Sequence, residues 1–74
     1  MRYNRNDEYL ILCGKRVREL RMSHGYSQEH FANLCDVEPS QISRIELGKI
    51  NTSISQALKI SAALHITMSE LFNF

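Results

Sequence analysis

Residues 27–48, SQEHFANLCDVEPSQISRIELG, constrain the fold of this chain more than any other segment. Their apolar positions recur at the spacing of two short helices, which a tight turn would separate. Ala32 occupies the position where the two helices would cross closely, and Val37 follows the turn. Ile42 and Ile45 would lie on the inner face of the second helix. Because only small or aliphatic side chains fit at these places, the pattern predicts two helices packed closely around the turn.

The second of these helices would expose polar side chains near its N-terminus, where a helix lying in the DNA major groove needs hydrogen-bonding groups. Gln41 can pair with N6 and N7 of adenine, and Arg44 can pair with guanine or bind a phosphate. Ser40 and Ser43 can donate to bases or phosphates alike, whereas Pro39 offers only an apolar contact, such as to a thymine methyl. We interpret the segment as a helix-turn-helix whose specificity depends mainly on Gln41 and Arg44.

The segments on either side extend this pattern through nearly the whole chain. Upstream stands GKRVRELRMSHGYSQEHFA, and downstream stand SRIELGK and SISQALKISAALHITMSELF. In order and spacing they resemble the lambda-repressor, Cro and Xre family of bacterial helix-turn-helix domains, and in size the chain resembles the stand-alone controller proteins of restriction-modification systems. The resemblance implies an all-α fold, a compact five-helix bundle whose second and third helices form the helix-turn-helix, and binding to double-stranded DNA.

The resemblance also assigns roles to residues outside the recognition helix. Gln28 would clamp a phosphate at the start of the second helix, where free N–H groups also face the DNA backbone. Lys49 and Asn51, in the loop that follows the recognition helix, would be phosphate contacts. Arg21 and Glu46 would form a partly buried ion pair that ties the recognition helix to the rest of the fold. The alternative for each residue is an independent, solvated side chain.

Local signals place the remaining helix boundaries. Asn6, followed by two acidic residues, favours a first helix over residues 7–23 with Asn6 as its N-cap. Pro39 favours a helix start with Glu38 as a poor cap, and Asp36 and His65 are expected in the left-handed conformation at helix ends. Further caps are expected at Ser27, at Ser53 and in the box Thr67-Met68-Ser69-Glu70. The buried faces are expected to contain Phe31, Ala32, Leu34, Cys35, Ile54, Ala57, Leu58, Ile60, Ser61 and Leu64.

The length of 74 residues indicates one domain, with residues 1–6 as a mobile extension. Two cysteines, Cys13 and Cys35, are too few and too far apart for a metal site built from cysteine pairs. We expect reduced core thiols, with a redox switch as the alternative, and no metal or cofactor. No apolar run approaches the roughly 18 residues of a membrane span, and no signal cleavage site is seen. The expected location is the cytoplasm.

The net charge of +1 is low for a DNA-binding protein, and its distribution is uneven. Residues 1–21 hold six basic and three acidic residues, whereas residues 22–47 hold one basic and four acidic residues. Phosphate neutralisation by one copy should therefore give only modest affinity, and salt should reduce it strongly. A dimer would double the contacts.

Dimerisation is also expected because one recognition helix contacts too few base pairs for discrimination in a genome. A symmetric dimer would place two recognition helices roughly 34 Å apart on a pseudo-palindromic operator. The C-terminal segment, residues 66–74, is more apolar than a terminal turn of a monomer should be. The alternative is that Leu71 and Phe72 only complete the core of the monomer. The expected dimer interface consists of Leu64, Ile66, Met68, Leu71, Phe72 and Phe74.

These observations favour a homodimeric, sequence-specific transcriptional regulator, either a restriction-modification controller or a small phage or plasmid repressor. RNA polymerase is a further expected partner. The acidic middle segment and the apolar tail keep a second class open, a protein-interaction module such as an antitoxin. An enzyme is not expected, because the chain contains no nucleophile elbow, phosphate loop or carboxylate pair at catalytic spacing.

Overall fold

The computed structural model describes the backbone of residues 5–74 and the side chains of residues 7–74. The described part contains helices and no strand, so the predicted all-α, five-helix fold is confirmed. The expectation of a mobile extension lies, for residues 1–4, outside the described residues. The predicted start of the first helix is wrong, because this helix already begins at Arg5 and Asn6 lies in its first turn. The helices are α1 (Arg5–Ser23), α2 (Gln28–Cys35), α3 (Pro39–Glu46), α4 (Ile54–Ala63) and α5 (Met68–Leu71).

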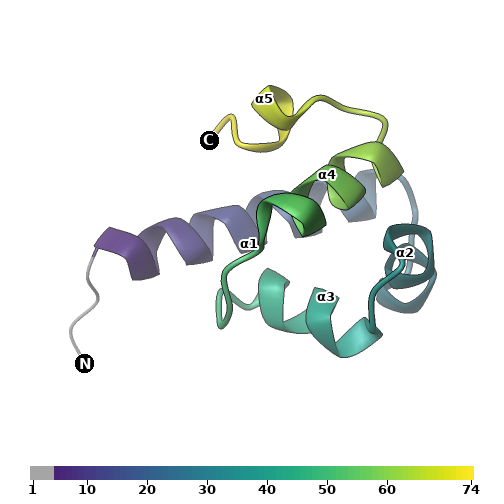
Figure 1. Ribbon diagram of the computed structural model, residues 1–74, viewed down its shortest axis with the longest axis horizontal. Helices are drawn as coiled ribbons and strands as arrows, with labels where there is room; N and C mark the ends of the chain where they lie inside the picture. Colours follow the sequence, from purple (N-terminus) through teal and green to yellow (C-terminus); the bar gives the residue numbers. More distant parts are fainter. Residues whose placement is uncertain (1–4) are drawn as a thin grey trace.

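The long helix α1 runs along the back of the molecule, with α4 in front of it and α3 below it (Figure 1). Helix α3 packs against α1 and α2, and α4 packs against α2 and α5. Helix α5 lies on the side of the molecule opposite α3 (Figure 1). The core between these helices consists of Val17, Phe31, Ala32, Cys35, Ile42, Ile45, Ala57, Ile60, Leu64 and Leu71. No helix in the described part of the chain is both long enough and apolar enough to cross a membrane.

Side-chain caps fix the starts of three helices as predicted. The hydroxyls of Ser27 and Ser53 each accept a hydrogen bond of 3.0 Å from a backbone N–H in the first turn of their helix. Thr67 and Glu70 form the expected capping box at α5. Helix α3 starts at Pro39, and Glu38 stands at the N-cap without a side-chain hydrogen bond. The recognition helix therefore has the weakest N-terminal cap of these four.

Left-handed residues end helices α2 and α4. Asp36 has φ of 56° and His65 has φ of 58°, as predicted for both. In this conformation the next residue can donate back into the last turn, from Val37 to the Ala32 carbonyl and from Ile66 to the Ser61 carbonyl, each at 3.0 Å. Asp and His enter this backbone region more readily than most residues, so both turns form without glycine.

A close approach of two backbones sets the position of α3. Gly14 is buried, and a Cβ at this position would lie 2.3 Å from the carbonyl oxygen of Ile45. Only a residue without a side chain permits this contact. The recognition helix is therefore held directly against the middle of α1.

Three of the predicted core residues are in fact exposed. The exposed fractions are 47% for Leu34, 77% for Ile54 and 54% for Leu58. Each lies on a short helix whose neighbouring apolar residues already fill the buried face. Spacing alone includes these residues because apolar positions on both sides of the stripe fit a helical period.

Two residues of the predicted dimer interface lie in the core of the monomer. Leu64 and Leu71 are each only 1% exposed, so they cannot contact a second copy. This part of the prediction is wrong, because Leu64 at the end of α4 and Leu71 in α5 both pack into the core of the monomer. Ile66 and Met68 are partly buried against the same core, whereas Phe72 and Phe74 are exposed.

Candidate nucleic-acid interface

Helix α3 separates its side chains into a buried and an outer face. Ile42 and Ile45 are fully or almost fully buried, as predicted. The other side chains face outward or lie at the border: Pro39, Ser40 and Arg44 are exposed, and Gln41 and Ser43 are half-buried. The outer face therefore combines an amide, two hydroxyls and a guanidinium, which are the donor and acceptor types that read base edges and phosphates.

The remaining candidates flank this helix. Lys49 and Asn51 are exposed in the loop after α3. Asn51 also borders an apolar hollow with residues at the start of α1, so it stands at the edge of the polar face. Gln28 is half-buried at the first position of α2.

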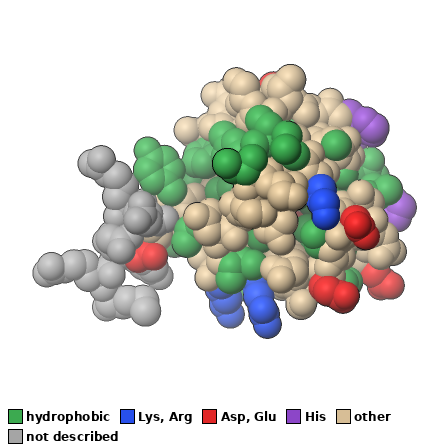
Figure 2. All heavy atoms as spheres, viewed as in Figure 1, with side chains coloured by type: hydrophobic (Ala, Val, Ile, Leu, Met, Phe, Trp, Pro, Cys, Tyr) green, Lys and Arg blue, Asp and Glu red, His purple; other side chains and the backbone are tan. Residues whose placement is uncertain are grey.

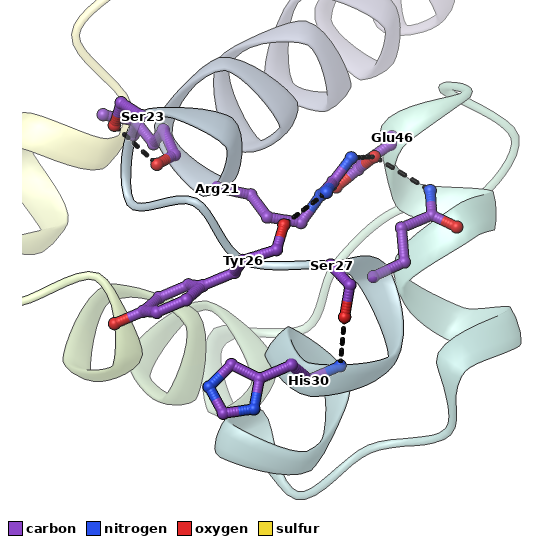
Figure 3. Close-up of polar contacts among 8 residues, drawn as sticks. Arg21, Ser23, Tyr26, Ser27, His30 and Glu46 are labelled. Carbon is purple, nitrogen blue, oxygen red and sulfur yellow. Dashed lines mark hydrogen bonds and ion pairs between the residues drawn. The ribbon is translucent and has the colours of Figure 1, made fainter.

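Arg21 and Glu46 join α1 to the end of α3 (Figure 3). The Arg21 Nε donates to Glu46 Oε2 at 2.6 Å, and Nη2 donates to Oε1 at 3.1 Å. Arg21 Nη1 also donates to the carbonyl oxygen of Tyr26 at 2.7 Å. Only 11% of the Arg21 side chain and 3% of the Glu46 side chain are exposed. This fork-to-fork geometry makes a strong charge-assisted pair that water can hardly reach.

Gln28 adds a third partner to this pair. Its side-chain amide donates to Glu46 Oε1 at 3.0 Å, so the N-terminus of α2 is tied to the C-terminus of α3. This contact could not be predicted from the sequence, because 18 residues separate the two positions and no local period connects them. We call Arg21, Gln28 and Glu46 the anchor network. The anchor network holds α1, α2 and α3 in one fixed arrangement.

The N-terminal end of α3 carries negative charge. Asp36 and Glu38 are exposed there and border a polar hollow together with Pro39. Neither carboxylate has a cation in this hollow. Asp36 and Glu38 therefore repel phosphates from this end of α3.

The two cysteines are free thiols. Burial raises the pKa of Cys35 to about 11, although Lys59 nearby opposes this shift, and burial also raises the pKa of Cys13. Burial thus favours the protonated form of both thiols, which is less reactive than the thiolate. Within the described residues, no group of three histidine, cysteine or acidic side chains is arranged to hold a metal ion.

An apolar surface borders the loop that follows α3, where Asn51 lines one of its hollows. Figure 2 shows hydrophobic side chains gathered over α5 and the C-terminal residues and continuing over the start of α1. Tyr9, Leu12, Phe72 and Phe74 are all between 40% and 57% exposed and border connected hollows. We call these four residues the tail patch. The predicted dimer interface includes its two phenylalanines but not Tyr9 and Leu12, although their spacing of three residues places both on one face of a helix.

Residues 17–71, which include all of α2, α3, α4 and α5, match the helix-turn-helix family HTH_3. The chain belongs to this family. This chain is 44% identical over 64 residues to the control protein C.MunI of a Mycoplasma species, and the match covers 85% of this chain and 86% of the relative. It is 40% identical over 65 residues to the control protein C.BamHI of Bacillus amyloliquefaciens, covering 86% and 80%.

A solved structure shows the same similarity. The restriction-modification controller protein C.AhdI from Aeromonas hydrophila superposes with a TM-score of 0.82 at 40% identity, covering 84% of this chain and 94% of that chain. The HTH_3 protein is therefore a DNA-binding transcriptional regulator with the five-helix architecture of controller proteins, and it is not an enzyme.

Proposed function

We propose that this protein is a restriction-modification controller that binds a pseudo-palindromic operator as a homodimer. The observation that supports this proposal most is the similarity to control proteins over 80% or more of both chains, because the match includes the whole motif and not a common module alone. A small phage or plasmid repressor would use the same interface. The comparisons favour the controller over an antitoxin-like interaction module.

The outer face of α3 supports sequence-specific binding. We assign base contacts to Gln41 and Arg44, because an amide and a guanidinium can each form two hydrogen bonds with one base. Pro39 and Ser40 lie beside the acidic N-terminal end, where an apolar or hydroxyl contact with a base is better tolerated than a phosphate. Lys49 and Asn51 are assigned to the DNA backbone. The full proposed set is Gln28, Pro39, Ser40, Gln41, Ser43, Arg44, Lys49 and Asn51.

The tail patch supports dimerisation. Phe72 and Phe74 keep their place in the proposed interface, and the exposed side chains of Tyr9 and Leu12 extend it along α1. Arg16 donates to the carbonyl oxygen of Glu70 at 2.8 Å, which fixes α5 beside α1 and gives the patch a defined shape. A patch of large apolar side chains on so small a protein is better covered by a second copy than left in water.

Regulation would follow from where the dimer binds. A bound dimer can exclude RNA polymerase from an overlapping promoter or contact polymerase from an adjacent site, so we propose polymerase as a second partner. A regulator of this kind acts where the operator is, and we therefore expect it in the cytoplasm.

Selection of bound duplexes from a random pool tests the proposal. We expect enrichment of a two-fold symmetric site whose half-sites lie about one helical turn apart. The affinity for the selected site should exceed that for a scrambled duplex of equal length and fall with added salt. Enrichment of an asymmetric site would contradict binding as a symmetric dimer. Absence of any enrichment would contradict sequence-specific binding to an operator.

A further inference from the structure

A hollow of about 250 Å³ lies where α1, α2 and α3 meet. Arg18 comes from α1, Gln28 begins α2, and Ser43 comes from the border of the outer face of α3. The buried ion pair forms the rest of the wall together with Leu47. The hollow thus lies directly beside the proposed DNA-reading face, and its polar groups come from three different helices.

The charge of this hollow is determined by Arg18. The carboxylate of Glu46 is neutralised within the anchor network, by two hydrogen bonds from Arg21 and one from Gln28. Arg18 is exposed, and no such bond is found for its guanidinium among the described side chains. One positive charge therefore remains uncompensated in the hollow.

Two neutral donors face the same space. The Gln28 amide has two N–H groups and uses one of them for Glu46, which leaves the other available. The Ser43 hydroxyl is half-buried at the edge of α3 and also lines the hollow. A guanidinium, an amide N–H and a hydroxyl around one hollow are donors that suit the oxygens of a single phosphate.

The resemblance already implies a phosphate contact for Gln28, and we propose that Arg18 and Ser43 complete it, so that the three side chains hold one phosphate of the DNA backbone. The inference rests on the proposed operator binding and adds Arg18 to the interface. It also assigns Ser43, which could serve bases or phosphates alike, to the phosphate. The anchor network holds the Gln28 side chain in place in the absence of DNA. Because Gln28 is bonded to Glu46 at the end of α3, a phosphate bound in this pocket would fix the register of α3 in the major groove.

Binding of Arg18→Gln and Ser43→Ala to the selected operator and to a scrambled duplex tests this pocket. Loss of Arg18 should weaken binding to both duplexes by the same factor, about 10-fold. The Arg18→Gln variant should also show a weaker salt dependence: the magnitude of the slope of log affinity against log salt concentration should fall by about 1 for each bound protomer. Loss of the Ser43 hydroxyl should weaken binding to both duplexes equally, by about 5-fold.

Lys59→Gln is the matched control, because Lys59 is an exposed cation on α4 that borders neither this hollow nor those of the tail patch. Equal losses in Lys59→Gln and Arg18→Gln would show a general charge effect and overturn the pocket. A Ser43→Ala loss confined to the operator would show that Ser43 reads a base and would overturn its assignment. Failure of the wild-type protein to prefer the operator would instead count against the proposed function.

Discussion

Glu46 is the residue on which three parts of the molecule converge. Its carboxylate accepts hydrogen bonds from α1 and α2 while its backbone ends α3. Glu46→Gln would leave the buried Arg21 guanidinium without its counter-charge. We expect the free energy of unfolding to fall by about 3 kcal/mol, because removing one partner of a buried pair leaves an uncompensated charge. Thermal and urea unfolding measure this loss.

Glu19→Gln is the control for that measurement, since Glu19 is an exposed carboxylate on α1. It should change stability by no more than about 0.5 kcal/mol. Equal melting temperatures for Glu46→Gln, Arg21→Met and the wild type would contradict the structural role of the pair.

The thiol of Cys35 gives a second test at the residue scale. Its pKa of about 11 means that almost all of it is protonated at pH 8, and its side chain is enclosed by the core. Alkylation at pH 8 followed by mass mapping should therefore modify Cys13 before Cys35. Modification of Cys35 in the folded protein as rapidly as in urea would show that the core opens freely at this position.

At the scale of the element, Gly14 determines how closely α3 approaches α1. A methyl group at this position would lie within 3 Å of three backbone atoms of α3. Gly14→Ala should destabilise the fold by about 1–3 kcal/mol, because backbone atoms cannot move aside as a flexible side chain can. Circular dichroism melting curves measure the loss.

Gly25→Asn serves as the comparison for Gly14→Ala. Gly25 has open space around it and φ of 71°, a conformation that asparagine tolerates. Gly25→Asn should lower the melting temperature less than Gly14→Ala does. The reverse order would show that backbone conformation, and not the contact between α1 and α3, limits stability.

The recognition helix is the element that should decide sequence preference. Gln41→Ala and Arg44→Ala should each weaken operator binding by about 1–3 kcal/mol and relax the preference at one base position. Binding to a scrambled duplex should change much less. Fluorescence anisotropy with both duplexes measures the ratio, and an equal loss on both would mean that these side chains contact only the DNA backbone.

The features of single helices were predictable from the sequence to different degrees. Caps and turns were predictable because they depend on a few consecutive residues, as at Ser53 and Asp36. Burial was less predictable, because Leu58 is apolar and correctly spaced yet lies outside the core. The link between Gln28 and Glu46 exists only after α2 and α3 have packed, so no local pattern contains it.

At the scale of the whole molecule, the sequence predicted a dimer interface within the C-terminal segment, whereas the proposed interface, the tail patch, also includes residues of α1. Leu71 belongs to the core, and the exposed part of the tail joins α1 through residues more than 60 positions apart, such as Tyr9 and Phe72. Such a surface can be recognised only when both ends of the chain are seen together.

Removal of the tail patch should dissociate the dimer. Phe72→Ser combined with Phe74→Ser takes two large apolar side chains from the proposed interface, while both are exposed in the monomer and should hardly affect its folding. Light scattering at micromolar concentration should show a dimer for the wild type and a monomer for the variant. Leu34→Ser, which changes an exposed leucine on α2, is the control. A variant that remains dimeric would place the interface elsewhere.

The dependence of binding on half-site spacing in the selected operator tests most directly whether a dimer reads DNA with α3. Two recognition helices held in one rigid dimer require half-sites on the same face of the DNA. Inserting about 5 base pairs, half a turn, between them should reduce affinity nearly to that of a single half-site, with two protomers bound to the original duplex. Affinity that is unchanged by the insertion, or one protomer per duplex, would contradict a dimeric controller that reads DNA with α3.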